Sequence, residues 1–169
     1  GMASQGSLVF QIVIGVVNVL STVLGMYLVD KIGRKQLVYV GVTGMFAMLI
    51  AIGAYFYLEF NNPNVLLYLI IGYIFFCAIS ICVVIWVLIS EMYPVKVRGL
   101  AMSMAGFSLW IGSYLIGQLT PVLLESLSPA ISFWIFAVMC IPYLLITRFY
   151  VPETTGKSLE EIEDIWIAH

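Results

Sequence analysis

Residues 86–99 read Trp86-Val-Leu-Ile-Ser90-Glu91-Met-Tyr-Pro94-Val-Lys96-Val-Arg98-Gly99 and pass from an apolar run into an ionic turn. The first part carries an indole and is apolar enough for a lipid bilayer. Glu91, Lys96 and Arg98 belong at the water boundary, because a charged side chain is costly in hydrocarbon. We interpret this stretch as a link between a binding site deep in a membrane and a gate at its edge.

The composition of the whole chain also indicates a membrane protein. Of its 169 residues, 63% are hydrophobic and 9% are charged, against roughly 45–50% and 25% in soluble domains. Apolar runs of about 20 residues favour helices over the short alternating strands of a membrane barrel. The predicted fold class is therefore all-α and integral to the membrane, and the net charge of −2 gives no indication of nucleic-acid binding.

Five apolar segments are predicted to cross the bilayer before a polar tail begins. The expected spans are Ser7–Val29, Leu37–Leu58, Leu66–Ser90, Leu100–Leu124 and Phe133–Val151, and the cytoplasmic tail covers residues 152–169. Ser158 and Glu161 have capping-box spacing, which predicts a short amphipathic helix in the tail. Its acidic face favours docking on a basic protein surface, with a merely solvated tail as the alternative.

All Lys and Arg residues fall at one end of the predicted spans. They are Lys31, Arg34, Lys35, Lys96, Arg98, Arg148 and Lys157. The connections at the other end, around residues 59–64 and 125–129, contain none. The positive-inside rule therefore predicts that the basic end and the C-terminus are cytoplasmic in a multi-pass cell-membrane protein.

No acidic side chain and no histidine falls inside a predicted span. Intramembrane catalysis needs a nucleophile with a base, or paired carboxylates, so an enzyme is not expected. Cys77, Cys82 and Cys140 lack Cys-x-x-Cys spacing, so no metal, cofactor or disulfide is expected. A proton relay commonly uses an intramembrane carboxylate or imidazole, and such a group would have to lie outside this chain.

The polar and aromatic side chains inside the spans are uncharged, and Asn18, Trp86 and Trp110 are the candidate substrate-binding residues. An amide both donates and accepts hydrogen bonds, and an indole stacks on the C–H face of a sugar ring. This set suits an uncharged polyhydroxylated ligand. The alternative is structural, with Asn18 bonding a neighbouring helix and each Trp serving as an anchor or a packing group.

An acid followed by bases recurs at the cytoplasmic turns. Asp30 precedes Arg34 and Lys35, and Glu91 precedes Arg98. Acids and bases at helix ends can pair in one conformation and separate in another, which predicts a charge network at a gate. The alternative is that these basic turns only set the topology.

Three motifs resemble the sugar porter family of the major facilitator superfamily. They are Gly25 to Lys35, similar to Gly-x-x-x-Asp-Arg/Lys-x-Gly-Arg-Arg/Lys; Ser90-Glu91-x-x-Pro94-x-x-x-Arg98-Gly99; and Pro152-Glu153-Thr154-Thr155-Gly156-Lys157-Ser158, similar to the Pro-Glu-Thr-Lys-Gly tail. Residues 11–35 look most like bacterial xylose–proton symporters, which favours a bacterial inner membrane. The resemblance implies that the five spans are helices eight to twelve of a twelve-helix transporter, with the first seven helices as partners.

The resemblance also implies roles for individual residues. Asn18, Trp86 and Trp110 would contact sugar, and the cytoplasmic charge network would comprise Asp30, Arg34, Lys35, Glu91, Arg98 and Glu153. The implied activity is alternating-access transport of a pentose or hexose, with proton symport as the leading hypothesis. Facilitated diffusion without protons, and a non-transporting sugar sensor or scaffold of the same fold, stay open as alternatives.

Two departures from the family pattern bear on movement and selectivity. Cys82-Val83-Val84-Ile85-Trp86 stands where the family has Gly-Pro-x-Pro-Trp. Without those prolines the third span is expected to be a straighter, better hydrogen-bonded helix, so that motion arises from rocking of the whole half. Leu109 precedes Trp110 where some members have Asn, so the family's sugar selectivity does not transfer to this chain.

Overall fold

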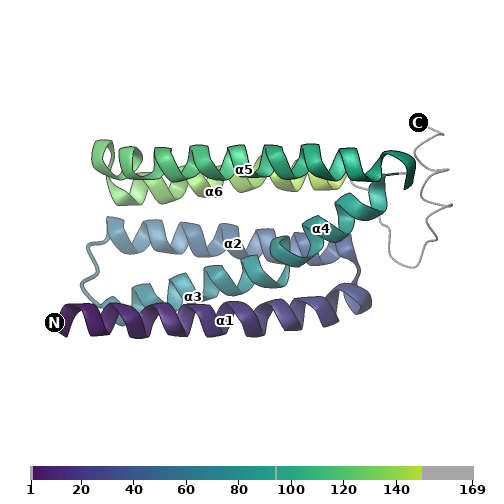
Figure 1. Cartoon of the computed structure of the whole chain (residues 1–169). Coiled ribbons are helices and arrows are strands. Elements are labelled where there is room, and N and C mark those ends of the chain that lie inside the picture. Colours follow the sequence, from purple (N-terminus) through teal and green to yellow (C-terminus); the bar gives the residue numbers. More distant parts are fainter. Residues whose placement is uncertain (1, 94, 150–169) are drawn as a thin grey trace.

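The fold is a bundle of long helices, drawn in Figure 1. The computed structural model describes residues 2–93 and 95–149, with the backbone alone at residues 2–7, 91, 92, 95 and 96. In chain order the helices are α1 (Met2–Ile32), α2 (Arg34–Tyr57), α3 (Pro63–Ile79), α4 (Ile81–Met92), α5 (Val95–Ser126) and α6 (Pro129–Phe149). The described residues form no strand, so the prediction of an all-α chain is confirmed.

Five helical segments are long and apolar enough to cross a membrane. They are Leu8–Ile32, Arg34–Tyr57, Pro63–Ser90, Val97–Ser126 and Pro129–Phe149. Each of the five spans expected from the sequence overlaps one of these segments. The helix predicted in the tail, residues 152–169, lies outside the described residues.

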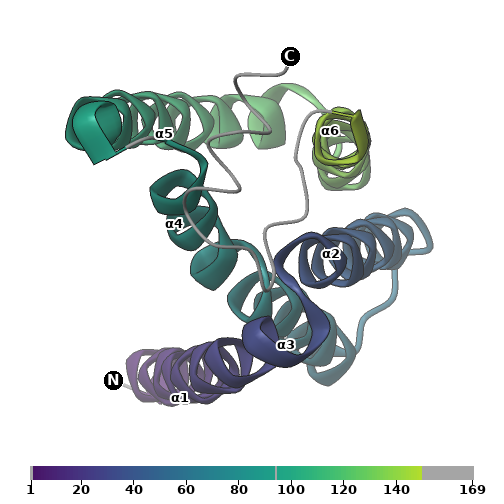
Figure 2. The same ribbon diagram turned by 90° about the vertical axis from the view of Figure 1, so that its right-hand side faces the viewer.

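Helix α2 is the structural centre of the bundle. It packs most extensively against α6 and next against α3, and Figure 2 shows it lying between them. Phe56 of α2 stacks on Phe133 of α6 with ring centroids 5.6 Å apart. The Trp134 indole N–H donates to the carbonyl of Ile50 at 3.4 Å. Gly53 permits this approach, since a β-carbon there would meet the Trp134 ring, and such small residues are typical of helix interfaces in membranes.

The turn between α1 and α2 takes a single residue. Gly33 has a φ of 98°, a conformation that any side chain disfavours, and its carbonyl accepts a hydrogen bond from the Leu37 amide at 3.1 Å. The tight turn brings the end of α1 onto the start of α2. There, a buried apolar cluster forms from Val29, Leu37, Val38, Val42, Val84 and Leu88.

The third predicted span is not one straight helix. Helix α3 ends at Ile79 and α4 begins at Ile81, while Ser80 between them has φ −115° and ψ −80°, away from helical values. Figure 1 shows α4 leaving the direction of α3 and slanting toward α5. The expectation of a straighter helix is therefore wrong, because this span breaks without the help of proline.

Two glycines on neighbouring helices lie against the break at Ser80. A β-carbon at Gly25 of α1 would be 2.7 Å from the carbonyl oxygen of Ile79. A β-carbon at Gly41 of α2 would meet the Ser80 side chain and would lie 2.9 Å from the carbonyl oxygen of Phe76. The Ser80 hydroxyl donates to the same Phe76 carbonyl at 2.7 Å, so the break keeps its polar groups bonded in an apolar setting. The bend thus depends on close contacts with α1 and α2.

Candidate functional site

The two candidate tryptophans lie on α4 and α5, two helices that contact each other. Cη2 of Trp86 is 3.8 Å from the place where a β-carbon at Gly106 would stand, and Trp110 follows Gly106 by four residues on the same face of α5. The side chains of Trp86 and Trp110 are 42% and 70% exposed. After the break at Ser80, α4 slants toward α5, and the Trp86 ring lies against α5 at Gly106, one turn before Trp110.

Asn18 lies on the exposed surface of α1, and α1 contacts α4. Its backbone carbonyl accepts a hydrogen bond from the Thr22 hydroxyl at 2.8 Å. Within residues 2–93 and 95–149 the Asn18 side chain has no hydrogen-bond partner. This part of the chain therefore gives no support to the alternative in which Asn18 bonds a neighbouring helix.

Helix α5 carries a line of uncharged polar and aromatic groups. Trp110, Tyr114 and Gln118 follow one another at intervals of four residues and so lie within about 80° of one another around the helix. Gly106 lies one turn before Trp110. Tyr114 is 64% exposed, and Gln118 is also exposed. Tyr114 and Gln118 were not among the candidate site residues predicted from the sequence, although their spacing of four and eight residues from Trp110 was a usable signal.

Three other hydroxyls of α5 are already bonded within the helix. Ser103, Ser108 and Thr120 each donate to the carbonyl four residues earlier, at 2.9, 2.9 and 2.7 Å. Such bonds are the usual way in which a helix satisfies a Ser or Thr in an apolar environment. The uncharged polar groups of α5 that make no hydrogen bond within the described residues are therefore the Trp110 indole, the Tyr114 hydroxyl, the Gln118 amide and the hydroxyls of Ser113 and Ser126.

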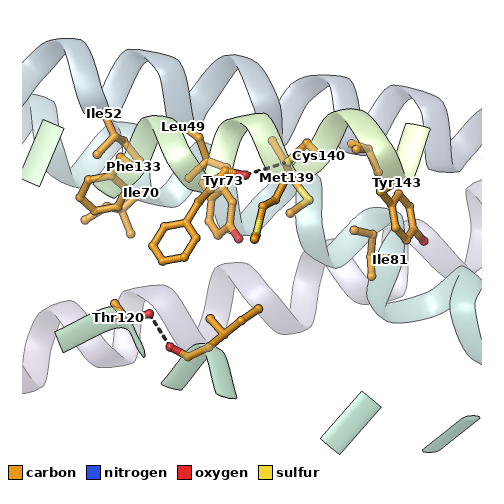
Figure 3. A pocket seen from close by; sticks show the side chains of 14 residues that line it. Leu49, Ile52, Ile70, Tyr73, Ile81, Thr120, Phe133, Met139, Cys140 and Tyr143 are labelled. Atoms are coloured by element: carbon orange, nitrogen blue, oxygen red, sulfur yellow. Dashed lines mark hydrogen bonds between the residues drawn. The ribbon is translucent and has the colours of Figure 1, made fainter. Parts of the chain in front are cut away.

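A separate apolar cavity lies among α2, α3, α4, α5 and α6, and Figure 3 shows its lining. Its volume is about 470 Å³, and its walls include Leu49, Ile52, Ile70, Ile81, Ile116, Phe133 and Met139. Among its polar groups, the Thr120 hydroxyl and the Cys140 thiol donate to backbone carbonyls of their own helices. Besides the Tyr73 and Tyr143 hydroxyls in its lining, a sugar would find few polar partners here. This largely apolar cavity therefore suits hydrocarbon or an apolar helix better than the predicted ligand.

The predicted charge network is only partly described by the structure. Asp30 is exposed near the end of α1, and Arg34 is half-buried at the start of α2. Glu153 and the side chain of Glu91 lie outside the described residues. Grouping of these side chains into a gate remains a prediction.

Two basic residues of the predicted network have backbone partners. The Lys35 ammonium donates to the carbonyl of Arg148, at the end of α6, at 3.1 Å. Nε of Arg98 donates to the carbonyl of Tyr93 at 3.4 Å. Lys35 therefore ties α2 to the C-terminal end of α6, where a cation is favoured by the helix dipole.

Relatives with known names share both sequence and fold with this chain. It is 38% identical over 167 residues to an arabinose-proton symporter of Bacillus subtilis, covering 99% of this chain and 36% of that protein. It is 34% identical over 172 residues to the D-xylose-proton symporter of Escherichia coli, covering 98% and 35%. It is 39% identical over 159 residues to a facilitated trehalose transporter of Bombyx mori, covering 90% and 31%.

Solved structures give the same likeness. The proton:xylose symporter XylE bound to 6-bromo-6-deoxy-D-glucose superposes with a TM-score of 0.88 at 34% identity, covering 96% of this chain and 35% of that one. The inward-open conformation of XylE from E. coli superposes with a TM-score of 0.86 at 35% identity, covering 96% and 37%. The chain thus spans about a third of the length of the relatives it matches. The family described as "Sugar (and other) transporter" matches residues 1–166, and the chain belongs to this family of membrane transporters.

Proposed function

We propose that the chain forms the C-terminal part of a transporter that imports a pentose or hexose together with a proton by alternating access. The support comes from the family, and from relatives that are named as arabinose- and xylose-proton symporters. We place the protein in the cell membrane, with a bacterial inner membrane favoured, and its basic turns and C-terminus in the cytoplasm.

One observation supports the choice of the surface that would bind sugar, which is called the sugar face below and comprises Trp86, Trp110, Tyr114 and Gln118. Trp86 reaches α5 at Gly106, and from there Trp110, Tyr114 and Gln118 continue along the same face. The face offers aromatic surface for a sugar ring and uncharged groups for its hydroxyls, with no charge that would demand an ion as ligand. Asn18 on α1 would complete this wall, and the remainder of the transporter would supply the opposite one.

Sugar would act by stabilising one arrangement of the two halves over another. A ligand can shift such an equilibrium only through its different affinities for the two states. Contacts among Asp30, Arg34, Glu91, Arg98 and Glu153 would hold the cytoplasmic side closed in one state and separate in the other. The five spans predicted from the sequence hold no carboxylate or imidazole, so the proton would be carried by a group in the rest of the transporter.

The test is sugar counterflow by the whole transporter in proteoliposomes. Trp110→Ala and Asn18→Ala should each weaken counterflow, because each removes a direct sugar contact, while both proteins keep the thermal stability of the parent. Unchanged transport in both variants would refute the site assignment.

Proton coupling has its own readout in the same preparation. Adding a transported sugar outside should make the medium more alkaline as protons enter with it. Uptake without a pH change would establish facilitated diffusion, and sugar binding without uptake would establish a sensor.

A further inference from the structure

Cys77 of α3 and Cys82 of α4 meet across the break at Ser80. Their Sγ atoms are 3.9 Å apart and share a hydrogen bond. In a continuous α-helix, residues five apart point about 140° away from each other around the axis, so such a pair would not be in contact. The two thiols are neighbours only because the helix is broken between them.

This pair differs from the third cysteine and from a metal site. The Cys140 thiol donates to its own helix, to the Phe136 carbonyl at 3.6 Å. Within the described residues no group of three or more His, Cys, Asp or Glu side chains could hold a metal ion. A structural zinc site needs four ligands, whereas this place offers two thiols and no nearby charge. Its chemistry suits a ligand that takes two sulfur atoms and leaves a neutral product.

We infer that Cys77 and Cys82 form a dithiol site for trivalent arsenic compounds, and that bridging the pair fixes the bend between α3 and α4. An organic arsenic(III) oxide loses its oxygen as water, which takes up the two thiol protons. Two arsenic–sulfur bonds replace two S–H bonds and the arsenic–oxygen bonding, and no atom changes its oxidation state. The product is uncharged, which suits a place within a membrane span.

The position of the pair gives bridging a mechanical consequence. Cys82 precedes Trp86 by four residues, so both lie on one face of α4, one turn apart. A bridge from Cys82 to Cys77 would tie this turn of α4 to the last turns of α3 and hold the Trp86 backbone at one angle. An effect on transport rests on the proposed function above, but formation of the bridge does not.

Binding is tested on the whole transporter with phenylarsine oxide, an apolar arsenical that can enter a membrane. Mass spectrometry of the digested protein should find one phenylarsenic group on the segment that contains both cysteines. Cys77→Ser and Cys82→Ser should each weaken binding about 100-fold or more, because one thiol loses the gain from intramolecular chelation. Cys140→Ser is the matched control and should bind like the parent.

Undiminished binding by either single variant, or loss of binding in Cys140→Ser, would overturn the assignment. Cys77→Ala and Cys82→Ala repeat the measurement in case a serine variant fails to fold.

Transport gives the second readout. Bound phenylarsine oxide should block counterflow in the parent and in Cys140→Ser, and ethanedithiol should restore it while a monothiol at equal thiol concentration should not. Full counterflow by the arsenical-bound parent would refute the fixing of the bend. Absence of counterflow before treatment would instead count against the proposed function, and the binding result would still stand.

Discussion

Helices α2 and α5 are both long and apolar, but they have different surroundings. Within the most apolar 18-residue window of each helix, 44% of the α2 residues are buried by the described residues, whereas none of the α5 residues is buried. Mean hydropathy in these windows is 2.1 for α2 and 1.4 for α5. Helix α2 packs against neighbours on two sides, while α5 shows Trp110, Tyr114 and Gln118 on an open face. The difference separates a helix that holds the bundle together from one that presents groups to a ligand.

The largest expected difference is between two leucines. Leu37 of α2 is 1% exposed and Leu115 of α5 is 51% exposed. Leu37→Ala should lower the free energy of unfolding by about 2–5 kcal/mol, because it leaves a cavity in a packed cluster. Leu115→Ala should change it by less than about 0.5 kcal/mol, as at most surface positions. Thermal unfolding of the two purified variants in detergent gives the comparison.

An equal loss of stability in both leucine variants would contradict the difference in burial between α2 and α5. It would mean that the Leu115 side of α5 is covered in the whole transporter as tightly as α2 is. A loss in Leu37→Ala alone would support an α5 that borders a cavity or lipid.

Two glycines give the next largest contrast. Alanine at Gly41 of α2 would meet the Ser80 side chain, whereas at Gly117 of α5 no atom of the described residues lies within 4 Å. Gly41→Ala should cost about 1–3 kcal/mol through overpacking. Gly117→Ala should be neutral, or stabilising by up to about 1 kcal/mol, because alanine is the better helix former.

The glycine pair is measured as the shift in unfolding temperature. An unchanged unfolding temperature in Gly41→Ala would show that Ser80 and the helix break can move away from α2. That result would contradict the close contacts seen in the structure.

Two tyrosines test whether the helices differ in role as well as in packing. The Tyr55 hydroxyl of α2 donates to the carbonyl of Asn62 at 3.1 Å, and Tyr114 of α5 belongs to the proposed sugar face. Tyr55→Phe should lower stability by about 0.5–1.5 kcal/mol and leave sugar affinity unchanged, since it removes one internal hydrogen bond. Tyr114→Phe should leave stability unchanged and weaken sugar binding roughly 2- to 10-fold.

Sugar titration and unfolding are measured on both tyrosine variants. A change in sugar affinity in Tyr55→Phe but not in Tyr114→Phe would reverse the roles given to the two helices.

The sequence predicted features that depend on a single helix, but not features that depend on contacts between helices. Composition and the length of the apolar runs were enough to predict an all-α chain, and the three motifs together were enough to indicate the family. The break at Ser80 was not predictable in this way, because it depends on Gly25 and Gly41, which are distant in the chain. Proline was the expected cause of a bend, and its absence led to the wrong expectation of a straight helix.

The candidate site shows the same limit. Trp86 and Trp110 were identifiable as aromatic groups in uncharged spans, but the contact of Trp86 with α5 at Gly106 follows from the slant of α4 toward α5. Cys77 and Cys82 were not expected to form a site because they lack Cys-x-x-Cys spacing. Their contact is a product of the same break.

The smallest expected effect concerns the water-facing end of α2. Lys35 donates to the Arg148 carbonyl at 3.1 Å, so it joins α2 to α6 where the dipole of α6 is negative. Lys35→Met should reduce stability by about 0.3–1 kcal/mol, and Lys35→Arg should keep most of it because a donor and a positive charge remain. High salt should shrink the difference between Lys35→Met and the parent, since the interaction is partly screened by mobile ions. Equal stability of parent and Lys35→Met at low salt would show that the packing of α2 on α6 needs no support from this end, and Lys35 would then be free to serve the predicted gate.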